Sequence, residues 1–154
     1  MTGRRLGLIA ALGSLGMMIA ALSFQYIGDL PPCKMCYWQR YPHIAAIGIG
    51  VLFLFLAYRG LLVLGALSAL TTGVIGVYHV GVEQKWWQGP DTCTSSPTDG
   101  LSVDQLLDQI MTAPLVRCDE IAWSLMGISM AGWNAIVSFA LGSLWVKAFR
   151  RSKA

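Results

Sequence analysis

The apolar residues of this chain are gathered into four long stretches that contain no Asp, Glu, Lys or Arg. The stretches cover residues 6–27, 41–58, 61–82 and 121–146, and they are 22, 18, 22 and 26 residues long. About 20 helical residues cross the roughly 30 Å hydrocarbon core of a bilayer, so each stretch is long enough to span it. The pattern predicts an all-α protein with four transmembrane helices in a single integral membrane domain, residues 1–154.

The segments between the predicted spans favour an up-down bundle, in which consecutive helices are antiparallel. Only Arg59 and Gly60 separate the second span from the third, and the longer connections are residues 28–40 and 83–120. Within the second connection, residues 102–112 have apolar positions at helical spacing, at Val103, Leu106, Leu107, Ile110 and Met111. We therefore expect a short amphipathic helix there, either lying at the membrane interface or packed on the end of the bundle.

The charged residues are few, and their signs differ between the two sides of the predicted bundle. Only 12% of the chain is charged and its mean hydropathy is +0.58, which excludes a soluble globular domain, a disordered chain and a nucleic-acid-binding protein. The two termini and the turn at residues 59–60 carry seven basic residues and no acidic ones, whereas residues 28–40 and 83–120 carry all eight acidic residues. The positive-inside rule then places both termini in the cytoplasm and the two loops outside.

The first predicted span also has the appearance of a signal peptide, because Arg4 and Arg5 precede its apolar run. A signal peptide has an apolar core of about 7–15 residues, which is shorter than this span. We therefore expect the first span to be retained as a membrane anchor.

All four cysteines lie in the two outward loops. Outside the cytoplasm disulfides are favoured, and the simplest of the three possible pairings joins Cys33 with Cys36 and Cys93 with Cys118. A C-x-x-C unit is typical of reversible dithiol chemistry, and Cys36 lies near the start of the second span, where a helix N-terminus favours a thiolate. The second pair would close a loop of about 26 residues, and it is either a structural staple or a second redox centre. We predict no metal site, because structural zinc usually takes two closely spaced pairs.

The cysteine motifs resemble those of the bacterial disulfide bond formation protein B family (DsbB). The segment from Cys33 to Arg40, CKMCYWQR, looks like the family's C-x-x-C-x-x-x-R motif. The stretches CDEIAW, residues 118–123, and SMAGWN, residues 129–134, are also similar to family members. The resemblance covers essentially the whole chain.

This resemblance implies an inner-membrane thiol:quinone oxidoreductase that sustains disulfide bond formation in periplasmic proteins. Cys93–Cys118 would oxidise the dithiol of a periplasmic thioredoxin-fold, DsbA-like partner, with Cys93 as the sulfur attacked. Electrons would then pass to Cys33–Cys36, and Cys36 would pass them to ubiquinone or menaquinone from the membrane pool. Neither a Rossmann glycine pattern nor a haem motif is present, so a lipid-soluble acceptor is the simplest choice.

Two further residues are expected to bind the quinone. Arg40 corresponds to the arginine of the family motif and would stabilise negative charge on the ring or on Cys36. His79 resembles a family histidine near the quinone. The alternatives are that Arg40 extends from the membrane interface towards water and that His79 is a local structural partner. His43 follows Cys36 by two helical turns on the same face, but no motif supports it and we do not assign it.

Two other functions are disfavoured by the same cysteines. A relay carrying reducing equivalents outward would need cysteines on the cytoplasmic side, where this sequence has none. A purely structural four-span protein would use its cysteines only to staple loops, and a C-x-x-C ring is too tight to staple much.

Overall fold

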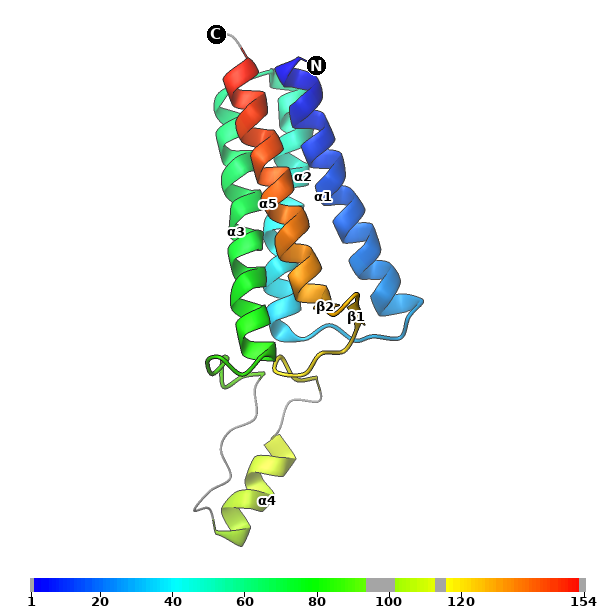
Figure 1. Ribbon diagram of the computed structural model, residues 1–154, viewed down its shortest axis with the longest axis vertical. Helices are drawn as coiled ribbons and strands as arrows, with labels where there is room; N and C mark the ends of the chain where they lie inside the picture. The colour runs from blue at the N-terminus through cyan, green and yellow to red at the C-terminus, as the bar shows by residue number, and fades with distance from the viewer. Residues whose placement is uncertain (1, 94–101, 113–115, 153–154) are drawn as a thin grey trace.

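The computed structural model describes residues 2–93, 102–112 and 116–152, and its main feature is a bundle of long helices (Figure 1). The helices of the bundle are α1 (Gly3–Tyr26), α2 (Lys34–Leu56), α3 (Gly60–Glu83) and α5 (Met130–Arg151). Both chain termini lie at one end of it. Near the other end lie α4 (Val103–Thr112) and a two-stranded hairpin of β1 (Ser124–Leu125) and β2 (Ile128–Ser129).

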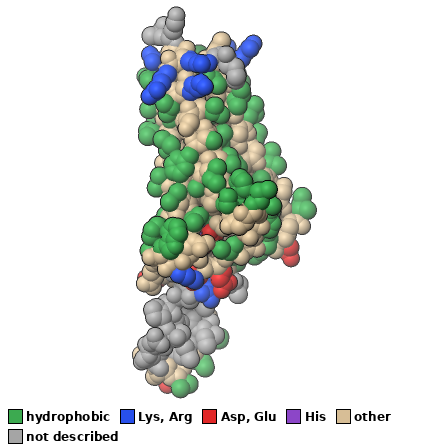
Figure 2. Space-filling model, viewed as in Figure 1, with side chains coloured by type: hydrophobic (Ala, Val, Ile, Leu, Met, Phe, Trp, Pro, Cys, Tyr) green, Lys and Arg blue, Asp and Glu red, His purple; other side chains and the backbone are tan. Residues whose placement is uncertain are grey.

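Three of these helices, α1, α2 and α3, are long and apolar enough to cross a membrane, so the chain is a multi-pass membrane protein. Figure 2 shows a cluster of Lys and Arg at the end of the bundle where the termini lie, and Asp and Glu together with further Lys or Arg near the opposite end. Apolar side chains cover much of the surface between the two ends. A fourth crossing, by α5, stays a prediction.

The helix that contains most of the second predicted span begins before it. Helix α2 starts at Lys34 rather than at residue 41, because the Cys33 side chain caps the helix by accepting a hydrogen bond from the Cys36 backbone N–H. Cys36 and Arg40 therefore lie within α2, on its first two turns, rather than in the preceding loop. The predicted span does not include this segment because Lys34 and Arg40 are charged.

The fourth predicted span is wrong over its first nine residues, 121–129. The hairpin occupies residues 124–129, and its turn residues Met126 and Gly127 have φ values of 54° and 76°. Two consecutive positive φ values are typical of a tight hairpin turn and cannot occur within an α-helix. Helix α5 begins only after Ser129, whose side chain accepts a hydrogen bond from Gly132, and it extends to Arg151.

The helix predicted within residues 102–112 is confirmed by α4. Ser102 and Gln105 form a reciprocal cap, because each backbone N–H donates to the other residue's side chain, over 2.9 and 3.3 Å. Figure 1 shows α4 beyond the end of the bundle. Its placement at a membrane interface stays a prediction.

Helix α1 packs against the bundle over only half of its length. Its buried residues all lie between Gly3 and Ser14, where they meet a core built around Trp145, Leu62 and Phe53. The second half of α1 diverges from the other helices, as Figure 1 shows. This divergence matters for the site, because the residues of that half line a cavity.

Close contact between α1 and α2 depends on Gly50. A Cβ atom added at Gly50 would lie 2.3 Å from the Cβ of Ala11, so the two helices would have to separate. We expect Gly50→Ala to reduce the free energy of unfolding by about 1–3 kcal/mol, the usual effect of overpacking a helix contact. The measurement is the midpoint of thermal unfolding of the protein in detergent.

Gly48→Ala is the matched control for this prediction. It lies on the same helix and gains the same helix propensity, but an added Cβ there meets nothing within 4 Å. Equal unfolding midpoints for the two variants would show that the contact at Gly50 does not limit stability.

Candidate functional site

The C-x-x-C cysteines lie where the chain enters α2. Cys33 is the N-cap residue and is 5% exposed, and Cys36 lies on the first turn of the helix. Their sulfur atoms are 2.7 Å apart, and neither is joined to another cysteine. This hydrogen bond and burial raise the pKa of the Cys33 thiol well above its usual value. Any thiolate of this pair therefore forms on Cys36, close to the partial positive charge of the helix N-terminus.

The second cysteine pair is a disulfide, Cys93–Cys118, as the sequence predicts. It joins the segment after α3 to the segment before β1, and both residues are buried. The Cys118 backbone N–H also donates to the Cys93 carbonyl oxygen over 2.6 Å. Next to the disulfide, the Asp119 carboxylate forms ion pairs with Lys85 and Arg117, at 2.5 and 3.0 Å, which hold this segment against the end of α3.

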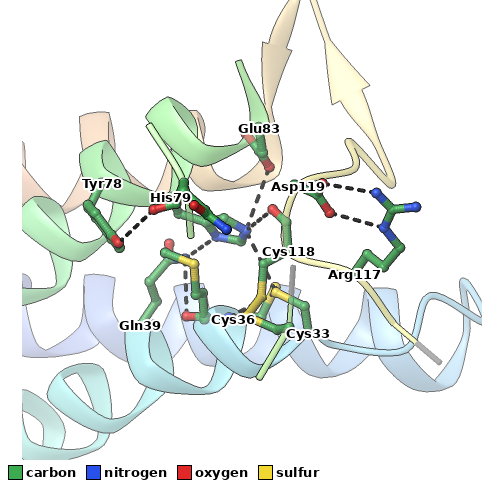
Figure 3. Close-up of a disulfide and its surroundings, with 12 residues drawn as sticks. Cys33, Cys36, Gln39, Tyr78, His79, Glu83, Arg117, Cys118 and Asp119 are labelled. Atoms are coloured by element: carbon green, nitrogen blue, oxygen red, sulfur yellow. Dashed lines mark hydrogen bonds and ion pairs between the residues drawn. A yellow bond between two sulfur atoms is a disulfide. The ribbon is translucent and has the colours of Figure 1, made fainter. Parts of the chain in front are cut away.

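The two cysteine pairs meet at His79, as Figure 3 shows. The sulfur atoms of Cys33 and Cys118 and a ring nitrogen of His79 all lie within 4.8 Å of one another. A small movement would therefore bring Cys33 Sγ, from one pair, into contact with Cys118 Sγ, from the other. Such a trio could also bind a metal, but Cys118 is in a disulfide here and offers no thiolate. The geometry of these three residues does not test the prediction that the protein has no metal site.

His79 connects three separate parts of the chain. The Gln39 amide donates to Nδ1 of His79 over 2.8 Å, and it also donates to the Met35 carbonyl oxygen. The other ring nitrogen, Nε2, then carries the hydrogen and donates to the Cys118 carbonyl oxygen over 3.2 Å. The imidazole thus ties α2 and α3 to the Cys118 segment.

A buried carboxylate, Glu83, completes this region. One of its oxygens lies 4.0 Å from Nε2 of His79. His79 precedes Glu83 by one turn on α3. The other oxygen accepts a hydrogen bond from the Ser129 hydroxyl, which also caps α5. Sequence reasoning missed both Glu83 and Gln39. The spacing of four residues from His79 to Glu83 on α3 is a local signal that could have identified Glu83, whereas nothing in the local sequence of Gln39 shows that it faces His79.

A cavity of about 260 Å³ adjoins the cysteines on the side where α1 diverges. Its wall includes Met17 and Phe24 of α1 and Val137 of α5, and its apolar side chains outnumber its polar ones. Cys36 and Arg40 line it from α2. This cavity is therefore an apolar chamber with a redox-capable sulfur in its wall.

The predicted Arg40 faces this cavity from its position on α2. Its guanidinium donates to the Gln25 side-chain oxygen over 2.6 Å and to the Ala21 carbonyl oxygen over 3.3 Å. Both partners belong to the diverging half of α1, so Arg40 bridges the two helices beside the cavity. The predicted His79 lines the same cavity, although both of its ring nitrogens have protein partners.

His43 and Asn134 also line the cavity, although sequence reasoning assigned neither of them. Cys36, Arg40 and His43 are spaced at i, i+4 and i+7, which places all three on one face of α2. The sequence showed that His43 shares a helical face with Cys36, but that spacing alone did not assign it to the site. Asn134 has no such signal, because it lies on α5, 91 residues from His43.

Comparison with known proteins is consistent with this site. The family model for disulfide bond formation protein DsbB matches residues 3–148. A disulfide bond formation protein B from Hahella chejuensis is 27% identical, with 98% of this chain and 96% of that protein covered. The protein of the same name from Shewanella amazonensis is 33% identical, over 92% of this chain and 86% of that protein. A Rickettsia prowazekii protein of uncharacterised function is 28% identical over 80% and 76% of the two chains. No solved structure matches.

Proposed function

Since the chain belongs to the disulfide bond formation protein DsbB family, whose members are membrane proteins of disulfide bond formation, we propose that it is a thiol:quinone oxidoreductase. In this proposal it reoxidises a periplasmic, thioredoxin-fold, DsbA-like partner and passes the electrons to ubiquinone or menaquinone. The observation that carries the proposal is the approach of Cys33 to Cys118 within 4.8 Å, with Cys36 in the wall of an apolar cavity.

The first step is exchange at the Cys93–Cys118 disulfide. A thiolate of the partner attacks Cys93 Sγ, and the bond to Cys118 breaks, which gives a mixed disulfide. The partner's second thiol then attacks the partner's first sulfur, which is bonded to Cys93, and Cys93 is released. The partner leaves with a disulfide, and Cys93 and Cys118 together hold the two electrons and two protons.

The second step moves these electrons between the two pairs. Cys118 as a thiolate attacks Cys33 Sγ of an oxidised Cys33–Cys36 pair, and Cys36 leaves as a thiolate at the start of α2. Cys93 then attacks Cys118, which restores the Cys93–Cys118 disulfide and releases Cys33 as a thiol.

The cavity has the features that a quinone ring requires, namely apolar walls and a few polar groups that converge on it. Arg40 has N–H donors beyond the two that bind Gln25 and Ala21, and His43 has a buried ring nitrogen with no hydrogen-bond partner among the described residues. When bound, a quinone accepts two electrons and two protons and becomes a quinol. Arg40 holds positive charge beside Cys36, where it stabilises a thiolate or a negatively charged ring oxygen.

We assign His79 a positioning role in this mechanism. Its bonds to Gln39 and to the Cys118 carbonyl, together with the contact of 3.7 Å between its Nε2 and Cys33 Sγ, hold the Cys33 and Cys118 segments near each other. Its direct contact with the quinone stays a prediction from the family resemblance.

The orientation in this proposal follows from the charges. The basic end of the bundle, which carries both termini, lies in the cytoplasm. The end that carries the four cysteines then faces the periplasm, and α5 makes the fourth crossing of the inner membrane. The dithiol partner approaches from the periplasm, and the quinone enters from the bilayer beside the diverging half of α1.

The proposed function is tested by coupled turnover of the purified protein in detergent. A reduced thioredoxin-fold dithiol protein and either ubiquinone or menaquinone are added, and quinone absorbance and partner thiols are followed together. We expect one quinone reduced for each partner disulfide formed, and none when the partner's thiols are alkylated beforehand. Partner oxidation without quinone consumption would contradict the proposal.

A further inference from the structure

His43 is a buried histidine that the steps above do not use. Its side chain is on α2 and lines the cavity, and the residue is only 3% exposed. Nε2 of His43 lies 3.0 Å from the Asn134 side-chain oxygen and 3.4 Å from the Ser138 hydroxyl. Nδ1 is buried and has no hydrogen-bond partner among the described residues. A buried polar atom without a partner is costly, so this nitrogen requires an explanation.

A chain of hydrogen bonds determines which ring nitrogen of His43 carries the hydrogen. The Thr72 hydroxyl donates to the Gln39 backbone carbonyl over 2.9 Å, and a carbonyl can only accept. Because a hydroxyl has one hydrogen, Thr72 must accept from Asn134, whose side-chain nitrogen lies 3.1 Å away and also donates to the Thr72 carbonyl.

The Asn134 side chain is thereby oriented with its nitrogen towards Thr72 and its oxygen towards His43. That oxygen is an acceptor, so Nε2 of His43 is the donor. In the neutral ring, Nδ1 then carries a lone pair and can only accept a hydrogen bond. Any hydrogen-bond partner of Nδ1 must therefore be a donor.

The two forms of a quinone differ in this respect. The ring oxygens of a quinone are carbonyls and have no hydrogen to donate, whereas the ring oxygens of a quinol are hydroxyls. A neutral His43 can therefore bind the reduced form but has nothing to offer the oxidised form. Arg40, which is a donor only, suits an acceptor oxygen instead.

We propose that His43 accepts a hydrogen bond from a quinol hydroxyl, so that the cavity binds the reduced form of the quinone more tightly than it would without His43. This inference rests on the proposed function and identifies a product-binding residue that the family motifs do not include. Selective binding of the reduced form favours reduction, because a ligand shifts an equilibrium towards the state that it binds better. The net change is that Cys33 and Cys36 become a disulfide while the quinone takes their two electrons and two protons.

The test compares the affinities of both ring forms for a His43→Gln variant. Glutamine keeps an amide donor near the position of Nε2, so the Asn134 bond and the fold can be retained, but it lacks an acceptor at the position of Nδ1. Ser138→Ala is the matched control, since Ser138 contacts the same ring at Nε2 and not at Nδ1. All proteins also carry Cys36→Ser, which prevents turnover during the measurement. The probes are a decyl-tailed benzoquinone and its hydroquinone, added without oxygen to the full-length protein in detergent, with binding measured by equilibrium dialysis.

We expect His43→Gln to weaken hydroquinone binding by about tenfold, the effect of losing one hydrogen bond. Its quinone affinity should change by less than about twofold, and Ser138→Ala should leave the hydroquinone-to-quinone affinity ratio unchanged. An equal loss for both forms, a greater loss for the quinone, or no loss at all would overturn the inference and leave the proposed function standing. If neither form binds the protein with His43 intact, the proposed function fails as well.

Discussion

Replacing Cys36 with serine should abolish coupled quinone reduction, with a fall of at least about a thousandfold in turnover, as is usual when a reacting nucleophile is removed. The reason is that the second pair can then neither form its disulfide nor release a thiolate beside the cavity. The Cys93–Cys118 disulfide lies on a different segment and remains intact in this variant. It should still oxidise about one equivalent of the partner in a single turnover, and then stop.

The measurement follows quinone absorbance and partner thiols under the same conditions as the wild-type assay. Lys34→Gln is the control, because Lys34 is an exposed residue inside the C-x-x-C unit whose replacement leaves both sulfurs in place. That variant should turn over. Sustained turnover of Cys36→Ser would rule out the electron path from Cys118 through Cys33 and Cys36.

Replacing Arg40 with leucine should raise the apparent KM for quinone by about tenfold to a hundredfold, which corresponds to the loss of a charge-assisted hydrogen bond. The rate at which the partner exchanges with Cys93–Cys118 should not change, because Arg40 contacts Gln25 and Ala21 of α1 and not the disulfide. Steady-state kinetics at varied quinone and saturating partner gives the first value, and single-turnover oxidation of the partner gives the second.

Two variants sharpen this prediction. Arg40→Lys keeps the charge but loses the planar fork of donors, so its KM should lie between those of the wild type and Arg40→Leu. Gln25→Met removes the partner that orients the guanidinium and should raise the KM less than Arg40→Leu does. An unchanged KM in all three variants would favour the other interpretation of Arg40, in which its long side chain simply extends from the membrane interface towards water.

The sequence predicts most of the bundle correctly because charges are costly inside a bilayer, and their absence therefore marks membrane-spanning residues. This criterion reports side-chain charge and not backbone conformation. It consequently excluded the first two turns of α2, which contain Lys34 and Arg40, and it included residues 121–129, which are uncharged but contain the hairpin of residues 124–129. Local signals, namely the capping geometry at Cys33 and at Ser129, decide where these helices begin.

The cysteine site, too, is only partly predictable from the sequence. The pairing of Cys93 with Cys118 is predictable because the C-x-x-C spacing already accounts for the other two cysteines. The contact between the two pairs is not predictable, since it depends on the rotation of α2 and α3 about their axes and on the path of the Cys118 segment. His79 and Glu83 lie one turn apart on α3, but only that packing brings Gln39 of α2 to His79.

The sequence by itself determined the membrane character of this protein, three helices that can span a bilayer and the residues that carry its sulfur chemistry, because charge, hydropathy and spacing are properties of the chain. Only the tertiary structure decided that Cys33 meets Cys118, that Cys36 opens onto a cavity beside α1, and that the His43 nitrogen Nδ1 has no hydrogen-bond partner among the described residues. These features depend on contacts such as those of His43 with Asn134 and of Thr72 with Gln39, which join different helices. Such contacts arise from the packing of whole helices, so no local stretch of sequence encodes them.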